Sequence, residues 1–132
     1  MRYLLDTCVV SDFAQGQAGV LARIKSVSPQ DIAVSSVTEM EVAYGLRLNP
    51  SLSRRLKPVM DAFFSAVLVL PYDRAAANAT AQVRAALKTR GLPIGAYDAL
   101  IAGTALAEQL TLVSSNTREF SRVAGLSVEN WR

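Results

Sequence analysis

The sequence predicts an α/β fold in which helices cover a mostly parallel β-sheet. Short apolar runs alternate along the chain with longer stretches whose apolar residues recur three and four positions apart, the spacing of a helix face. No repeat, low-complexity tract or linker-like segment interrupts this alternation, so residues 1–132 are expected to form one domain. Such alternation favours parallel strands, because two parallel strands are joined by a crossover that is usually a helix.

Each expected strand is a short apolar run that stops at a polar residue or a proline. The first run, Tyr3–Leu5, stops at Asp6, and the third stops at Pro71, which cannot donate a hydrogen bond to a sheet. The expected strands are residues 3–5, 31–36, 67–71, 111–115 and 126–128.

The expected helices lie between these strands. Pro58 falls inside one of them, and we expect a kink or a break there because proline removes a backbone donor and clashes with the preceding turn. Gly91 is a stop signal at the end of a long alanine-rich helix. The expected helices are residues 20–28, 37–48, 52–67, 74–91, 95–108 and 117–123.

Composition removes several kinds of chemistry. The chain has no histidine and one cysteine, Cys8, so it lacks the base of Ser-His-Asp and Cys-His mechanisms, an internal disulfide and the ligands of a structural zinc site. Hydrolysis would have to use carboxylates, hydroxyls, Lys and Arg, or a hard cation such as Mg²⁺ or Mn²⁺ bound by oxygen. No apolar run approaches the ~20 residues that span a bilayer, and no signal peptide is recognisable. We therefore expect a cytoplasmic protein without membrane contact.

Five of the eleven acids stand where strands end or helices begin. In parallel sheets, functional sites form beyond the carboxyl ends of the strands, which directs attention to these acids. Asp6 ends the first strand; it is either a turn or helix-capping residue, or a carboxylate held at the strand end with support from Thr7. The five acids are Asp6, Glu39, Glu41, Asp98 and Glu119.

Glu39 and Glu41 compete for a place in such a site. If Ser36 caps the helix over residues 37–48, Glu39 is its third residue and completes a capping box, which leaves Glu41 without a structural role. The helix is apolar on almost every side, so its periodicity does not decide between the two acids.

Asp98 lies on the apolar side of the helix over residues 95–108. With Gly95 as the cap, it falls in the first turn, where the helix dipole favours an acid, but an unpaired carboxylate on a buried face is costly. A divalent cation shared with Asp6 and Glu41 would remove that cost and lower the pKa of a water molecule that attacks a phosphodiester. The neighbours of Asp98 at helical spacing are Ile101, Ala102 and Ala105.

Four segments, in this order, resemble the motifs of PIN-domain ribonucleases: LLDTCVVSDF, SSVTEMEVAYG, GLPIGAYDALIAGTAL and LVSSNTREFSRVAGLSVENW. The chain most resembles the VapC-type toxins of bacterial toxin–antitoxin pairs, over essentially its whole length. This resemblance implies a three-layer α/β/α sandwich with a central, mostly parallel sheet, formed by a PIN domain over residues 1–132. It also implies an acidic cluster that binds Mg²⁺, or Mn²⁺ in its place, and cleaves RNA.

The resemblance also implies a role for individual residues. Asp6, Glu41 and Asp98 match the first three acids of the family and would hold the metal, with Thr7 and Ser114 in support.

The fourth acidic position departs from the family pattern. Many members have an aspartate shortly after the last strand, where this chain has Asn116, and Glu119 is the nearest acid. Either residue could fill the position, and the spacing Asn116-x-x-Glu119 also fits a second capping box. Because of this departure, the alternative to a nuclease is a non-catalytic PIN-like module that binds RNA or a partner protein.

The resemblance implies partners as well. It predicts an RNA substrate such as a transfer RNA. It also predicts a homodimer and a hetero-oligomer with a VapB-type antitoxin, and contact with operator DNA only through that antitoxin. Without the four candidate acids, the chain has seven acidic and fourteen basic residues. Eleven of the basic residues are arginines, whose planar guanidinium group suits phosphate. Arg84, Arg90 and Arg118 are the expected RNA contacts.

Overall fold

Five short strands form one sheet, and every pair of neighbouring strands is parallel. The computed structural model describes residues 1–132 and gives the strand order β3-β2-β1-β4-β5. Each strand overlaps the run expected for it, so the predicted sheet is confirmed. The strands are β1 (Tyr3–Leu5), β2 (Ile32–Ser35), β3 (Leu68–Leu70), β4 (Thr111–Val113) and β5 (Val128–Glu129).

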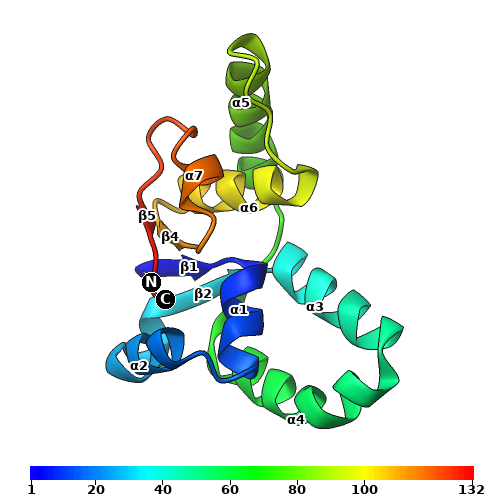
Figure 1. The fold of residues 1–132 in the computed structure, drawn as a ribbon. Helices are drawn as coiled ribbons and strands as arrows, with labels where there is room; N and C mark the ends of the chain where they lie inside the picture. Colours follow the sequence, from blue (N-terminus) through cyan, green and yellow to red (C-terminus); the bar gives the residue numbers. More distant parts are fainter.

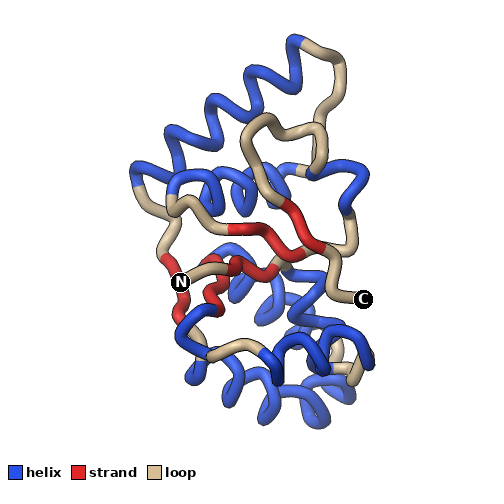
Figure 2. Tube along the Cα trace, turned by 90° about the vertical axis from the view of Figure 1, so that its left-hand side faces the viewer, coloured by secondary structure: helices blue, strands red, loops and turns tan.

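Helices cover both faces of this sheet, which is the layer between them in Figure 2. In Figure 1, α5, α6 and α7 lie on one side of the strands and α1, α2 and α4 on the other, so the three-layer sandwich is confirmed. None of these helices has both the length and the apolar composition needed to cross a bilayer. The helices are α1 (Thr7–Ala14), α2 (Ala18–Ser26), α3 (Ser36–Leu48), α4 (Pro50–Ala66), α5 (Arg74–Thr89), α6 (Ala96–Ala107) and α7 (Thr117–Phe120), and a 3-10 turn spans Pro29–Asp31.

The strands supply alternate side chains to two apolar cores, because successive residues of a strand point to opposite faces. On β1, Leu4 joins the core formed with α5, α6 and α7, whereas Tyr3 and Leu5 join the core formed with α1, α2 and α4. Helix α3 contributes to both, with Val37 in the first core and Val42 against the second. This arrangement holds α3 at the carboxyl ends of the strands.

Helix α1 has no counterpart among the expected helices. It begins directly after β1, where the Asp6 carboxylate accepts a hydrogen bond from the Val9 amide at 2.9 Å and caps the helix. Asp6 is therefore the helix-capping residue that the sequence offered as one of two interpretations. The signal for this helix was present, because a capping acid three residues before the apolar pair Val9 and Val10 is a helix-start pattern.

The expected break at Pro58 is wrong. Helix α4 continues through this residue to Ala66. Proline removes the amide that would bond to the carbonyl four residues earlier, at Arg54, and both residues are exposed, so water can solvate that carbonyl. Buried Met60 and Phe63 on the opposite side fasten the helix to the core.

The expected cap of α3 is displaced by one residue. Ser35 is the cap, with its hydroxyl oxygen accepting from the Val37 amide at 3.0 Å, whereas Ser36 is the first helical residue and accepts from the Tyr72 amide at 3.1 Å. The capping box between Ser36 and Glu39 is therefore wrong. The connection after β3 occupies the Ser36 hydroxyl, so Ser36 makes no cap.

Candidate active site

Candidate acids come together beyond the carboxyl ends of the strands. Asp6 follows the central strand β1, and only 3% of its surface is exposed. Burial raises the pKa of Asp6, while hydrogen bonds from the Ser114 hydroxyl and the Val9 amide act against that rise. Ser114 follows the neighbouring strand β4 and is fully buried, and it lies beside Asp6; its supporting role stays a prediction.

Glu41 reaches the same region from α3. The Thr7 hydroxyl, at the first residue of α1, donates to Glu41 Oε1 at 2.7 Å, and the Thr38 hydroxyl lies 3.2 Å from Thr7 Oγ1. The carboxylate of Glu41 contributes to the raised pKa of both Asp6 and Asp98. Thr7 thus contacts a candidate acid directly.

Asp98 lies in the first turn of α6, after the N-cap Gly95, and is half-buried. Its pKa is raised to about 6, first by burial and then by the negative charges of Asp6, Glu119 and Glu41 in that order. The electrostatic effect shows that four carboxylates from four elements share one neighbourhood.

The two candidates for the fourth acidic position, Asn116 and Glu119, are in contact with each other. The Asn116 side-chain amide donates to Glu119 Oε2 at 3.1 Å, and the Asn116 backbone amide donates to Ser114 Oγ at 2.9 Å. The Asn116 side chain makes no helix-capping hydrogen bond, so the second capping box does not form. Asn116 holds Glu119, and Glu119 supplies part of the negative charge that raises the pKa of Asp98.

No cationic side chain neutralises these four acids. All three ion pairs of the structure use other carboxylates. Desolvated acids that repel one another favour protonation or a bound cation. The ion pairs are Arg23–Glu129, Lys57–Asp61 and Arg132–Asp12.

The donor chemistry of the cluster fits a hard divalent cation, because every candidate ligand is a carboxylate or amide oxygen. The side chains do not close around one point: no three Asp, Glu, Cys or His side chains converge tightly enough to hold a metal ion as they stand. Glu41 is turned towards Thr7 and Glu119 towards Asn116. The candidate acids would have to draw closer together to share one cation.

Two of the expected RNA-contacting arginines have free side chains. Arg84 on α5 and Arg118 on α7 are exposed and make no side-chain hydrogen bond. Arg90 follows the end of α5, the helix that projects from the sheet in Figure 1, and donates to the Arg122 carbonyl oxygen at 2.8 Å. Arg90 therefore has a structural contact, and its contact with RNA stays a prediction.

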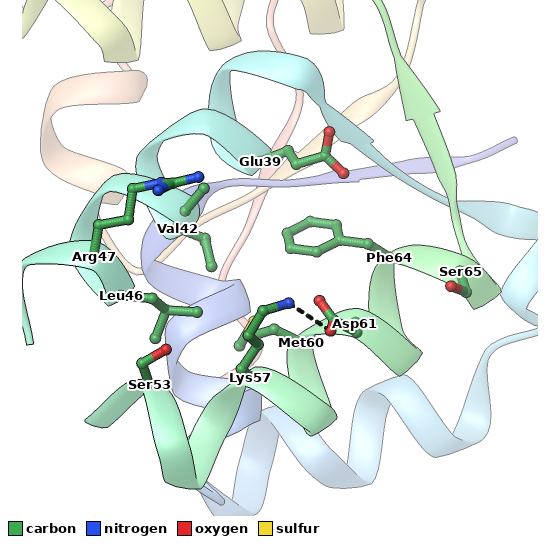
Figure 3. Close-up of a pocket in the computed structure, with 11 residues that line it drawn as sticks. Glu39, Val42, Leu46, Arg47, Ser53, Lys57, Met60, Asp61, Phe64 and Ser65 are labelled. Atoms are coloured by element: carbon green, nitrogen blue, oxygen red, sulfur yellow. Dashed lines mark hydrogen bonds and ion pairs between the residues drawn. The ribbon is translucent and has the colours of Figure 1, made fainter. Parts of the chain in front are cut away.

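A groove between α3 and α4 lies outside the acidic cluster (Figure 3). It has a volume of about 630 Å³ and is lined by Glu39, Arg47 and the Lys57–Asp61 ion pair, among others. Glu39 is exposed and faces this groove, so the structure separates it from Glu41.

Sequence reasoning missed Thr38. Its side chain is fully buried, and its hydroxyl contacts the same Thr7 hydroxyl that is hydrogen-bonded to Glu41. The available signal was the spacing Thr38-x-x-Glu41, which places both side chains on the same side of a helix. That signal is weak by itself, because a buried helical threonine usually bonds to its own backbone.

Comparison with known proteins identifies the architecture. The model of the PIN domain family matches residues 3–126. A protein of Shigella flexneri described as a tRNA(fMet)-specific endonuclease VapC is 37% identical over 131 residues, which cover 99% of this chain and 98% of that protein. A protein of Haemophilus influenzae described as ribonuclease VapC2 is 34% identical, with 99% of this chain and 98% of that protein covered.

Solved structures agree. VapBC from Salmonella typhimurium bound to DNA matches with a TM-score of 0.90 and 35% identity, over 100% of this chain and 99% of that chain. VapBC2 from Rickettsia felis, bound to a fragment of its promoter, matches with a TM-score of 0.91 and 28% identity over the whole of both chains. Dependence on a divalent metal is general among PIN-domain VapC nucleases. From its sequence, its parallel sheet and its relatives, this chain belongs to the PIN-domain family and, within it, to the VapC group.

Proposed function

We propose that this protein is a metal-dependent endoribonuclease and acts as the toxin of a type II toxin–antitoxin pair. The observation that carries the proposal is the electrostatic coupling of Asp6, Glu41, Asp98 and Glu119 at one edge of the sheet, with no cationic side chain among them. Repulsion between neighbouring carboxylates favours the uptake of a cation, and a nuclease needs a cation at the phosphate.

The roles follow from the placement of the acids. Asp6, Glu41 and Asp98 would hold Mg²⁺, or Mn²⁺ as a substitute, and Glu119 would add the fourth carboxylate with Asn116 holding it in place. When bound, the cation supplies Lewis-acid stabilisation of the scissile phosphate and lowers the pKa of the attacking water.

Protein donors hold one oxygen in each of two carboxylates of the cluster. The Val9 amide donates to Asp6 Oδ1 at 2.9 Å, and the Thr7 hydroxyl donates to Glu41 Oε1 at 2.7 Å. Fixed carboxylates lose less freedom when they take up a cation, which favours binding.

Transfer RNA is the substrate that the relatives favour, because the Shigella and Salmonella proteins are described as specific for tRNA(fMet). We infer a tRNA substrate for this chain. The exposed guanidinium groups of Arg84 and Arg118 would contact its phosphates. The site of action would be the cytoplasm, where tRNA is found.

A VapB-type antitoxin is the proposed protein partner. The matching structures from Rickettsia felis and Salmonella typhimurium are VapBC complexes bound to DNA. We propose that this chain forms a homodimer, assembles with its antitoxin into a hetero-oligomer, and meets operator DNA through the antitoxin.

The test uses the purified protein free of antitoxin. Incubated with total tRNA, it should cleave RNA in Mg²⁺ or Mn²⁺ and stop in EDTA, and sequencing of the new RNA ends should identify one bond. Asp98→Asn keeps the side-chain shape but loses the charge and should be inactive, whereas Glu108→Gln, an exposed change after the same helix, should cleave normally.

Two results would contradict the proposal. Full cleavage in EDTA would remove the metal mechanism. Tight RNA binding without cleavage in any metal would favour a non-catalytic binding module, the function to which the asparagine at position 116 and the open arrangement of the acids also point.

A further inference from the structure

Thr38 has an unusual place for a buried threonine. Its side chain is fully buried in the first turns of α3, and its hydroxyl oxygen lies 3.2 Å from Thr7 Oγ1 on α1, 31 residues away in the sequence. The other buried helical threonines, Thr80 and Thr104, donate instead to carbonyl oxygens four residues earlier in their own helices. Thr38 is thus the buried helical threonine whose hydroxyl bonds to a different helix.

The direction of the hydrogen bonds follows from the number of protons. Each hydroxyl group has one proton, and an ionised carboxylate only accepts. The Thr7 proton is used by Glu41 Oε1 at 2.7 Å, so Thr7 Oγ1 has to accept the proton of Thr38. Thr38 makes no other side-chain hydrogen bond, and no buried polar side-chain atom lacks a partner.

We propose that Thr38 is a positioning residue of the active site, acting on Glu41 through Thr7. By donating to Thr7, it fixes the rotation of that hydroxyl so that the Thr7 proton points at Glu41. Glu41 Oε1 is then held, while Oε2 makes no hydrogen bond within the protein and is left for a ligand. This inference rests on the proposed function, in which Glu41 binds the cation.

The Thr38–Thr7–Glu41 chain also connects two helices that start at different strands. Thr7 is the first residue of α1 and Thr38 is the third residue of α3, so the two hydroxyls couple the starts of the helices that supply Asp6 and Glu41. Loss of the Thr38 hydroxyl would leave the partly buried Thr7 oxygen without its donor and free the Thr7 proton to turn. The carboxylate of Glu41 would then be less ordered.

The experiment compares Thr38→Val, which keeps the shape and loses the hydroxyl, with Thr38→Ser, which keeps the hydroxyl. Mn²⁺ binding is measured by electron paramagnetic resonance of the free ion, together with Tm. We expect Thr38→Val to weaken Mn²⁺ affinity by about tenfold or more, the loss typical of residues that orient metal ligands. Thr38→Ser should bind Mn²⁺ almost as the wild type does.

Two controls separate positioning from packing. Thr80→Val removes a buried hydroxyl elsewhere and should lower Tm without changing Mn²⁺ affinity. In a Thr7→Val background, Thr38→Val should have no further effect on Mn²⁺ affinity, because the proposed influence of Thr38 passes through Thr7. If Thr38→Val does not fold, Thr38→Ala takes its place in the same comparisons.

Unchanged Mn²⁺ affinity in folded Thr38→Val, equal loss in Thr38→Ser, or full loss on top of Thr7→Val would each overturn the proposal. If the wild type binds no Mn²⁺, the proposed function fails, and crystal structures of the metal-free proteins still decide the positioning role. A Thr7–Glu41 contact that stays at 2.7 Å in Thr38→Val would overturn it, and a lost or lengthened contact would support it.

Discussion

The side-chain amide of Asn116 donates a hydrogen bond to the carboxylate of Glu119 at 3.1 Å. Asn116, which stands where many family members are expected to have an aspartate, therefore holds Glu119, the acid three positions later. The negative charge at this corner of the cluster belongs to Glu119, which raises the pKa of Asp98.

Removing the Glu119 charge should lower the pKa of Asp98. Glu119→Gln keeps an oxygen near Asn116 and loses the charge that disfavours ionisation of Asp98. Carboxyl ¹³C NMR titration of the metal-free protein measures the pKa, and the cleavage rate should fall by about tenfold or more, as for other changes around a metal site. Asn116→Ala keeps the charge and should lower cleavage less. An Asp98 pKa that does not move in Glu119→Gln would contradict this assignment.

The metal-free protein should lose stability as the pH rises towards neutrality. The pKa of Asp98 is raised to about 6, and that of Asp6 is also raised, whereas an aspartate of the unfolded chain titrates near ~3.9. Between these values the folded protein binds more protons than the unfolded chain, so the free energy of unfolding decreases with pH and the decrease due to Asp98 is complete above about pH 6. Tm should therefore be higher at pH 5 than at pH 7.

The same measurement has a matched control and a metal arm. Asp98→Asn cannot ionise and should flatten the dependence of Tm on pH, whereas the exposed change Glu108→Gln should leave it as it is. Mn²⁺ should raise Tm more at pH 7 than at pH 5, since it binds the ionised carboxylates. The same pH slope in Asp98→Asn and in the wild type would show that Asp98 is not the group responsible.

Glu39 and Glu41 should behave oppositely although they are two residues apart. Glu39 is exposed, makes no side-chain hydrogen bond and faces the α3–α4 groove, so Glu39→Gln and Glu39→Ala should change neither Tm nor cleavage. Glu41→Gln can still accept from Thr7 and should fold normally, but it should lose most cleavage and Mn²⁺ affinity. Cleavage rate, Mn²⁺ binding and Tm check all three variants, and an active Glu41→Gln would remove Glu41 from the site.

The effect of each arginine substitution on RNA binding and Tm should depend on whether the side chain has a partner within the protein. Arg84→Ala and Arg118→Ala remove exposed side chains without partners, so they should weaken RNA binding, reduce its salt dependence by about one unit of slope each, and leave Tm unchanged. Arg90→Ala should also lower Tm, because it removes the hydrogen bond to the Arg122 carbonyl. Arg55→Ala, an exposed change on α4, is the control for lost charge. RNA affinity that falls equally in Arg55→Ala would point to overall charge alone.

Much of the architecture was readable because it depends on local features. An apolar run that stops at a polar residue marks the end of a strand, and parallel strands bring such ends to one edge of a sheet, which is how the acids at strand ends and helix starts came to be expected together. Asp98 was identifiable because helical periodicity places a lone acid on an apolar face, and its pKa of about 6 has the cause expected for such a place.

Contacts between distant segments decided the rest. Ser35 rather than Ser36 caps α3, because Ser36 receives the amide of Tyr72 from 36 residues away. Helix α4 passes through Pro58 because its opposite side is anchored in the core, a fact that the proline's own surroundings in the sequence do not contain. Local sequence preference is overridden where packing or a distant hydrogen bond stabilises the fold by more than the loss of one backbone hydrogen bond destabilises it.

The sequence by itself therefore determined the sheet, the sandwich and the acids at its edge, since periodicity and strand ends are properties of neighbouring residues. Only the tertiary structure decided that the hydroxyls of Thr38 and Thr7 are in contact, that Thr7 donates to Glu41, and that Asn116 donates to Glu119. The first two of these contacts join residues more than 30 positions apart, and all three depend on side-chain orientations, which neither spacing nor composition specifies.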